Sequence, residues 1–68
     1  MNVGDVSERS GLPVKTIRYY AVVGLVRPQR SSNGYRLLRE DHLHKLKFIG
    51  RARSLGFSLE ECRDLMSL

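Results

Sequence analysis

The stretch from Pro13 to Gly24 constrains the fold of this 68-residue chain most strongly. Read at helical spacing, it separates into two faces. One face is apolar and repeats at steps of three and four residues, which is typical of a helix that buries one side against a core. Its members are Val14, Ile17, Tyr20 and Ala21. The other face carries two long cations, an aromatic hydroxyl group and no acid. Its members are Lys15, Arg18, Tyr19 and Val22.

The basic face of this helix suits a surface of phosphates and base edges, because arginine and lysine donate hydrogen bonds to both. We therefore interpret it as a recognition helix for the major groove of DNA. The charge distribution agrees with this interpretation. From Arg9 to Arg39 the chain has seven cations and no acid, whereas from Glu40 to Leu68 it has five charges of each sign. A basic half of this length favours a nucleic-acid partner over a merely solvated surface.

A short helix is predicted before the recognition helix, from Asn2 to Arg9. Gly11 should end it, because glycine adopts the left-handed stop conformation at little cost. Leu12 then reads as a core anchor in a tight turn, and Pro13 fits at or just before the first turn of the next helix. Two short helices joined in this way match a helix-turn-helix, although many helical hairpins have similar spacing.

A β-hairpin is predicted after the recognition helix. Gly24 should close that helix, and Leu25-Val26 should follow as a short extended run. Pro28 excludes a central strand position after it. Asn33-Gly34 is a strong turn signal, and Tyr35 to Leu38 should return as a strand. We call this hairpin the wing; as a basic ribbon it could lie along the DNA backbone, the alternative being a solvated hairpin without a partner. Its candidate contact residues are Arg27, Arg30, Tyr35 and Arg36.

Two further helices are predicted after the wing. The first runs from Glu40 to Leu55, and we expect it to bury a broad face made of two stripes. These stripes are Leu43, Leu46 and Ile49, and beside them Phe48, Ala52 and Leu55. Gly56 should stop this helix, and Ser58 with Glu61 should cap the next one. The apolar side of the last helix comprises Leu59, Cys62, Leu65 and Met66.

The sequence shows no constellation of catalytic or metal-binding residues, and we expect neither an enzyme nor a bound cofactor. Cys62 is the only cysteine, so it forms no intramolecular disulfide and reads as a buried thiol. His42 and His44 diverge on a helix and cannot chelate together. No apolar run is long enough for a membrane span, so we expect a protein of the reducing cytosol.

Several motifs occur in register along essentially the whole chain, and the Ile-Arg-Tyr-Tyr and Gly-Tyr-Arg runs among them are specific markers at this separation. These motifs are Asn2-Val3-Gly4-Asp5-Val6, Gly11-Leu12, Thr16-Ile17-Arg18-Tyr19-Tyr20, Gly24-Leu25-Val26, Pro28, Asn33-Gly34-Tyr35-Arg36, Phe48-Ile49 and the run from Arg51 to Glu61. With them, the chain resembles the N-terminal DNA-binding domain of MerR-family transcriptional regulators. It is most similar to the metal-responsive branch, which includes copper-efflux regulators.

The resemblance implies a mainly α-helical fold of the winged helix-turn-helix type, with residues 1–68 as the DNA-binding domain. Such regulators work as homodimers on palindromic promoter DNA. They distort the DNA in response to an effector so that RNA polymerase can use the promoter. The effector, a metal ion in the metal-responsive branch, and the dimerisation helix would lie beyond residue 68.

The DNA-binding residues that the resemblance implies are Lys15, Thr16, Arg18, Tyr19, Tyr35, Arg36 and Arg53. Arg18 would make the base contact, Arg36 would hold phosphate from the wing, and Arg53 would reach the backbone from the third helix. Four places depart from the family's usual pattern, and they are Pro13, Ala21-Val22-Val23, Arg39 and Gly50. Pro13 supplies no side-chain N-cap, and Gly50 should weaken its helix by roughly 1 kcal/mol relative to alanine.

Two other functions fit the same residues. An excisionase-like architectural protein shares the fold and bends DNA without an effector. A small basic adaptor would instead use the basic face to bind an acidic protein. Binding to duplex DNA that weakens steeply with salt separates the adaptor from the other two.

Overall fold

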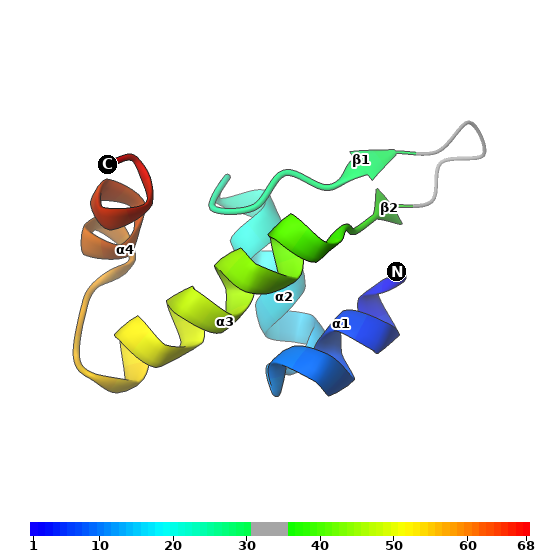
Figure 1. Ribbon diagram of the computed structural model, residues 1–68, viewed down its shortest axis with the longest axis horizontal. Helices are drawn as coiled ribbons and strands as arrows, with labels where there is room; N and C mark the ends of the chain where they lie inside the picture. Colours follow the sequence, from blue (N-terminus) through cyan, green and yellow to red (C-terminus); the bar gives the residue numbers. More distant parts are fainter. Residues whose placement is uncertain (31–35) are drawn as a thin grey trace.

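The computed structural model of the chain describes residues 1–30 and 36–68 (Figure 1). This part is mainly helical, as the sequence predicted. Its helices are α1 (Val3–Ser10), α2 (Val14–Val22), α3 (Glu40–Ser54) and α4 (Leu59–Met66). Two short strands, β1 (Gln29–Arg30) and β2 (Arg36–Leu37), pair antiparallel with Gln29 opposite Leu37. The long helix α3 has the strand pair near its N-terminal end and α4 at its C-terminal end (Figure 1).

Local hydrogen bonds fix α1 and the turn into α2. The side chain of Asn2 caps α1 by accepting a hydrogen bond from the Asp5 N–H at 2.8 Å. Gly11 ends α1 in the left-handed conformation, with φ of 78°, which confirms the predicted stop. The Ser7 hydroxyl then donates to the carbonyl of Leu12 at 2.6 Å. Pro13 precedes α2 without a side-chain cap, as expected.

The predicted extended run at Leu25-Val26 was wrong. Both residues lie in a bend, because their amides donate to the carbonyl of Tyr20, at 2.9 and 3.4 Å, rather than to a partner strand. Their side chains are buried in the core. The first strand begins only at Gln29, directly after Pro28. Of the predicted returning strand, Tyr35 lies outside the described residues.

The hydrophobic core lies between the first three helices and extends to α4. It comprises Val6, Ile17, Tyr20, Leu25, Val26, Leu38, Leu43, Leu46, Ile49, Ala52 and Cys62. The first predicted stripe of α3 is therefore confirmed. The second stripe was wrong for two of its members, because Phe48 is 40% and Leu55 is 78% exposed. Leu65 and Met66 of α4 lie beside Phe48 around a shared open hollow but leave it partly exposed, so only Ala52 of that stripe is buried.

The connection from α3 to α4 follows the predicted stop and start signals. Gly56 has a φ of 99°, and its N–H donates to the carbonyl of Arg53 at 3.0 Å. The Phe57 N–H reaches the carbonyl of Ala52 at the same distance, which completes a Schellman motif. Within α3, a Cβ atom at Gly50 would lie 3.4 Å from Leu12 Cδ2. Gly50 has a low intrinsic helix propensity, but it lies where Leu12 of the α1–α2 turn packs closely against α3.

From the N-cap of α4 we predict that the stability of the fold depends on the ionisation of Glu61. The Ser58 N–H donates to the Glu61 carboxylate at 2.9 Å, and this bond, with the Ser58 hydroxyl, lowers the pKa of Glu61. A lowered pKa means that the ionised cap stabilises the fold above the unfolded pKa. This contribution disappears as the pH falls through the lowered value. Carboxyl NMR should show Glu61 titrating at lower pH in the folded chain than in the urea-unfolded chain, and Ser58→Ala should reduce the difference. Equal titration in the two states would contradict the role of the cap.

Candidate nucleic-acid interface

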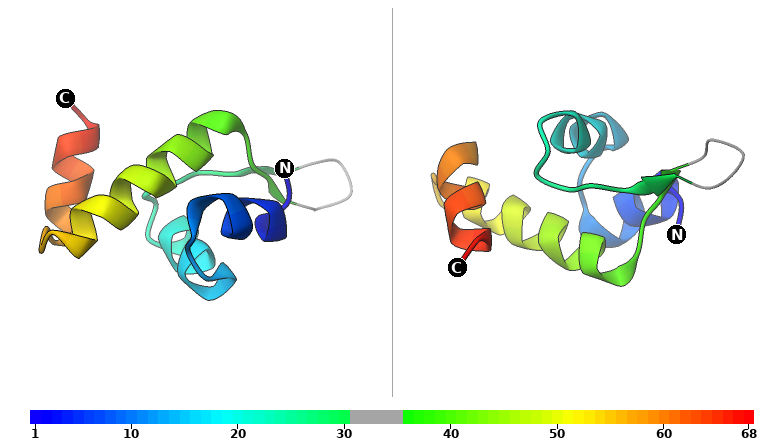
Figure 2. Two further views of the ribbon diagram at one scale, coloured as in Figure 1. Left: turned by 60° about the horizontal axis from the view of Figure 1, so that its bottom comes forward. Right: turned by 90° about the horizontal axis from the view of Figure 1, so that it is seen from above.

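The outer face of α2 is exposed, as the two-faced pattern predicted. Lys15, Arg18 and Tyr19 are exposed, with Tyr19 at 50%, while Ile17 and Tyr20 on the opposite side are 1% and 7% exposed. Figure 2 shows α2 at the surface of the molecule. With nine residues, α2 is about 13 Å long, and the major groove of DNA is about 12 Å wide. Its whole exposed face can therefore enter one groove.

The N-terminus of α2 adds to the positive character of this face. A helix leaves its first backbone N–H groups without intrahelical acceptors, and Pro13 provides no side chain to accept from them. The first turn also contains no acidic residue. Such a helix end attracts anions such as phosphate.

Four of the predicted site residues surround one open hollow of about 350 Å³. Lys15, Thr16 and Tyr19 contribute from α2, and Arg53 contributes from α3. Arg53 Nη1 donates to the carbonyl of Phe57 at 3.0 Å, which holds the guanidinium group beside the start of α4. Because a guanidinium group has five N–H donors, others remain for a phosphate oxygen. The α3–α4 connection thus places a cation next to the basic face of α2.

The remaining predicted residues lie apart from this hollow. Arg18 is on the exposed face of α2 but does not line the hollow. Arg36 is placed by its backbone in β2, opposite Arg30. Tyr35 lies outside the described residues, so its predicted contact is carried by the sequence alone.

Two residues outside the predicted site bond to backbone groups of other segments through their side chains. Arg63 on α4 donates from Nη2 to the carbonyl of Val23 at 2.6 Å and so holds the C-terminal end of α2. Forty residues separate this pair, and no local pattern reveals it. His42 is only 7% exposed and contacts backbone groups of Arg39 and Arg27.

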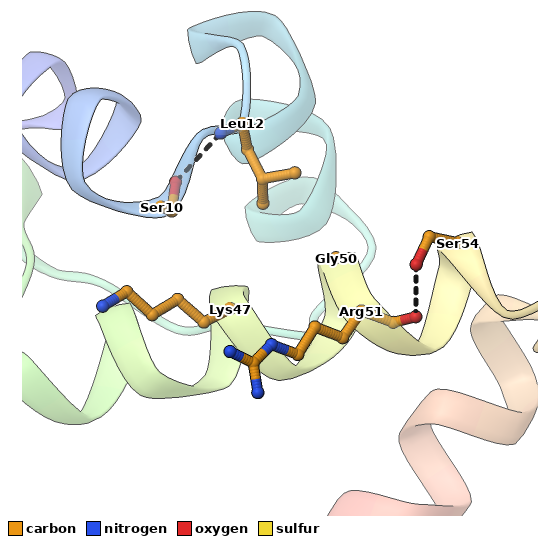
Figure 3. Close-up of a pocket in the computed structure, with 6 residues that line it drawn as sticks. All are labelled: Ser10, Leu12, Lys47, Gly50, Arg51 and Ser54. Atoms are coloured by element: carbon orange, nitrogen blue, oxygen red, sulfur yellow. Dashed lines mark hydrogen bonds between the residues drawn. The ribbon is translucent and has the colours of Figure 1, made fainter.

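A second hollow, of about 380 Å³, lies between α3 and the α1–α2 turn (Figure 3). It contains two exposed cations, Lys47 and Arg51. In this hollow the Ser10 hydroxyl accepts from the Leu12 N–H, and the Ser54 hydroxyl donates to the carbonyl of Arg51. None of the predicted site residues lines it, so the surface of α2 remains the better candidate.

The described part of the chain was also searched for metal-binding groups and for helices that could cross a membrane. Among residues 1–30 and 36–68, no group of three or more histidine, cysteine or acidic side chains could hold a metal ion. The thiol of Cys62 is completely buried, as expected. In the same residues, no helix has both the length and the apolar character needed to cross a membrane.

The fold and the surface define the class of the protein. Two short helices joined by a tight turn, with the second helix presenting an exposed basic face, form a helix-turn-helix domain. A family model described as the MerR HTH family of regulatory proteins matches residues 1–68. The chain therefore belongs to the MerR family.

Curated relatives and solved structures agree with this assignment. The chain is 60% identical over 68 residues to the regulator HmrR of Rhizobium leguminosarum bv. viciae, covering all of this chain and 53% of that protein. It is 48% identical over 69 residues to CueR of Salmonella typhimurium, covering all of this chain and 50% of the relative. The crystal structure of the regulator PbrR691 from Ralstonia metallidurans CH34 with lead(II) superposes with a TM-score of 0.90 and 37% identity. That match covers 98% of this chain and 53% of the other.

The chain spans about half the length of the relatives it matches. These relatives are named as transcriptional regulators, and the matching family model describes helix-turn-helix regulatory proteins.

Proposed function

We propose that residues 1–68 form a winged helix-turn-helix domain in which α2 reads the major groove of promoter DNA. The observation that carries this proposal is the exposed basic face of α2, with Arg53 beside it at a shared hollow. Lys15, Arg18 and Tyr19 face the groove in this arrangement. Thr16 lines the same hollow and would contact the DNA backbone in this proposal.

The strand pair β1–β2 forms the base of the proposed wing. Its antiparallel pairing brings Arg30 and Arg36 opposite one another in the chain's most basic half. Arg36 and Tyr35 hold phosphate oxygens of the backbone in this proposal, as Arg53 does from α3. Phosphate contacts from two sides of α2 would fix its depth and orientation in the groove.

The whole regulator, in our proposal, acts as a homodimer in the cytoplasm and distorts a palindromic promoter for RNA polymerase. The energy of distortion depends on the DNA sequence, so many backbone contacts suit this mechanism. Relatives support a metal ion as the effector, since one is named heavy metal-dependent transcription regulator 1 of Rhizobium meliloti, at 46% identity, and another structure contains lead(II). In our proposal the effector and the dimerisation contacts lie outside residues 1–68.

Salt-dependent binding tests this function with a matched pair of lysines. Lys15 lies on the exposed face of α2, whereas Lys45 is an exposed lysine on α3 outside the proposed interface. We expect Lys15→Gln to reduce the slope of log affinity against log salt by about one phosphate contact and Lys45→Gln to leave it unchanged. Fluorescence anisotropy with a duplex selected from a random pool measures both slopes.

Two results would reject the proposal. Equal slopes for both variants would show that the face of α2 does not contact the duplex. Tight binding to an acidic protein without binding to any duplex would favour the adaptor instead. An excisionase-like role would appear as strong bending of the selected duplex by a protein that no effector regulates.

A further inference from the structure

The side chain of Arg63 on α4 is hydrogen-bonded to the C-cap residue of α2. Its Nη2 atom donates to the Val23 carbonyl oxygen at 2.6 Å, across 40 residues of sequence. A hydrogen bond from a charged donor is shorter and stronger than one between neutral groups. Among residues 1–30 and 36–68, neither of the two close acid–base pairs includes Arg63, so no carboxylate competes for its guanidinium group.

The C-terminal end of α2 depends on such a partner from another helix. Ala21-Val22-Val23 supplies only apolar side chains, and the last turn of α2 contains no basic residue. The carbonyl groups of residues 19–21 accept from the backbone amides that follow the helix. The Val23 carbonyl lies beyond them, and a cation beside it complements the partial negative charge of a helix C-terminus. Arg63 therefore supplies from α4 what the sequence of α2 lacks.

Arg63 projects from a helix that is anchored to the core. The adjacent Cys62 is completely buried, and Leu59 and Met66 of the same helix are partly buried against the core. A capping box fixes the first turn of α4. The hydrogen bond thus joins the end of α2 to a helix whose own position is set by packing.

The bonded end of α2 and its proposed groove contacts belong to one helix of nine residues. A shift at Val23 therefore tilts the helix and displaces Arg18 and Tyr19 on its exposed face. Hydrogen bonds to base edges require donor–acceptor distances of about 2.7–3.2 Å. Attraction to phosphates acts over about 10 Å at 0.1 M salt. A small tilt of α2 consequently weakens base contacts more than it weakens phosphate attraction.

We propose that Arg63 is a positioning residue for base recognition, which sets the tilt of α2 in the major groove through the Val23 carbonyl. This inference rests on the proposed function, because it requires α2 to enter the groove. It goes further in naming a residue outside the contact surface and a helix, α4, that controls the fit. Arg63 acts through α2 and does not itself touch DNA.

The experiment compares wild type with Arg63→Gln and Arg51→Gln. Glutamine removes the charge and is too short to replace the arginine fork. Arg51 is an exposed arginine on α3 outside the proposed interface, so its variant controls for the loss of one positive charge. Fluorescence anisotropy measures affinity at several salt concentrations. The two probes are a duplex that wild type selects from a random pool and an unrelated duplex of equal length.

We expect Arg63→Gln to lower the ratio of the two affinities, selected over unrelated, by about 2- to 10-fold, the effect of one net hydrogen bond. Arg51→Gln should leave this ratio unchanged. The ratio is the decisive quantity, because a smaller folded fraction would reduce both affinities by the same factor. An unchanged ratio for Arg63→Gln would overturn the proposal.

The dependence on salt distinguishes positioning from direct contact. Arg63→Gln should keep the same slope of log affinity against log salt as Arg51→Gln, because neither variant removes a phosphate contact. A slope reduced by about one phosphate contact in Arg63→Gln alone would show that Arg63 binds DNA itself. That result would also overturn the positioning role.

A measurement without DNA separates this inference from the proposed function. The Gly24 N–H belongs to the same peptide unit as the Val23 carbonyl, so its NMR signal should shift in Arg63→Gln and not in Arg51→Gln. Absence of duplex binding by wild type would reject the proposed function, while this signal would still show whether Arg63 holds the end of α2. An unchanged Gly24 signal would overturn the inference even if Arg63→Gln binds DNA less tightly.

Discussion

Arg18→Ala is expected to weaken binding to a selected duplex by about 1–3 kcal/mol and to relax the preference for particular bases. Arg18 is exposed on α2, whose length fits the major groove, and its side chain can form two parallel hydrogen bonds with a guanine edge. Alanine at this position keeps the helix but removes both bonds. The loss of affinity should therefore be large for the selected duplex. It should be small for a duplex in which the base pair that Arg18 contacts is already changed.

The measurement compares wild type and variant on the selected duplex and on duplexes with single base-pair changes. Arg36→Ala should weaken binding to all duplexes alike, because phosphate contacts do not read sequence. Arg51→Ala is the control, since Arg51 is an exposed arginine on α3 outside the proposed interface. A sequence-selective loss for Arg36→Ala with a uniform loss for Arg18→Ala would reverse the roles assigned to these residues.

Leu46→Ala is expected to destabilise the domain by about 2–5 kcal/mol, the usual effect of removing a fully buried leucine side chain. Leu46 has no exposed surface and lies in the middle of the α3 stripe. Small domains are stable by only about 5 kcal/mol or somewhat more, so a large fraction of the variant should be unfolded. Its DNA binding should fall for this reason, although Leu46 has no exposed surface with which to contact DNA.

Leu55→Ala is the matched control, because it makes the same substitution at the C-terminal end of the same helix. Leu55 is 78% exposed, and its truncation should change stability by less than about 0.5 kcal/mol. Urea unfolding followed by circular dichroism measures both variants. Similar losses for the two would contradict the arrangement in which only one stripe of α3 faces the core.

The parts of the fold that the sequence predicted correctly depend on neighbours in the chain. The stops at Gly11 and Gly56, and the cap that Ser58 and Glu61 form, involve partners within a few residues. The same holds for the two faces of α2, because helical periodicity determines them before any tertiary contact exists. Local rules were sufficient at these positions.

The incorrect or missing parts depend on contacts between distant segments. Phe48 and Leu55 have the spacing of a buried stripe, but both side chains are exposed in the structure, Leu55 almost fully. Leu25-Val26 has strand-forming residues, yet its amides bond to the end of α2. The partners of His42 and Arg63 lie 15 and 40 residues away, and periodicity carries no information about such pairs.

The candidate site was predictable to different degrees. The α2 face followed from residue spacing, whereas the placement of Arg53 beside it was implied by the family resemblance and is supported by the hollow that they share. The groove and phosphate contacts themselves stay predictions. The predicted contact of Tyr35 stays a prediction as well, since this residue lies outside the described part of the chain.

The buried thiol of Cys62 gives the chain a built-in reporter. It is the only cysteine in the sequence and the one buried residue of the eight-residue helix α4. A thiol reagent can reach its Sγ atom only when α4 detaches from α3, so the rate of labelling counts these opening events. Because Arg63 of the same helix donates to the carbonyl of Val23 at the end of α2, the labelling rate also measures how often α2 loses this support.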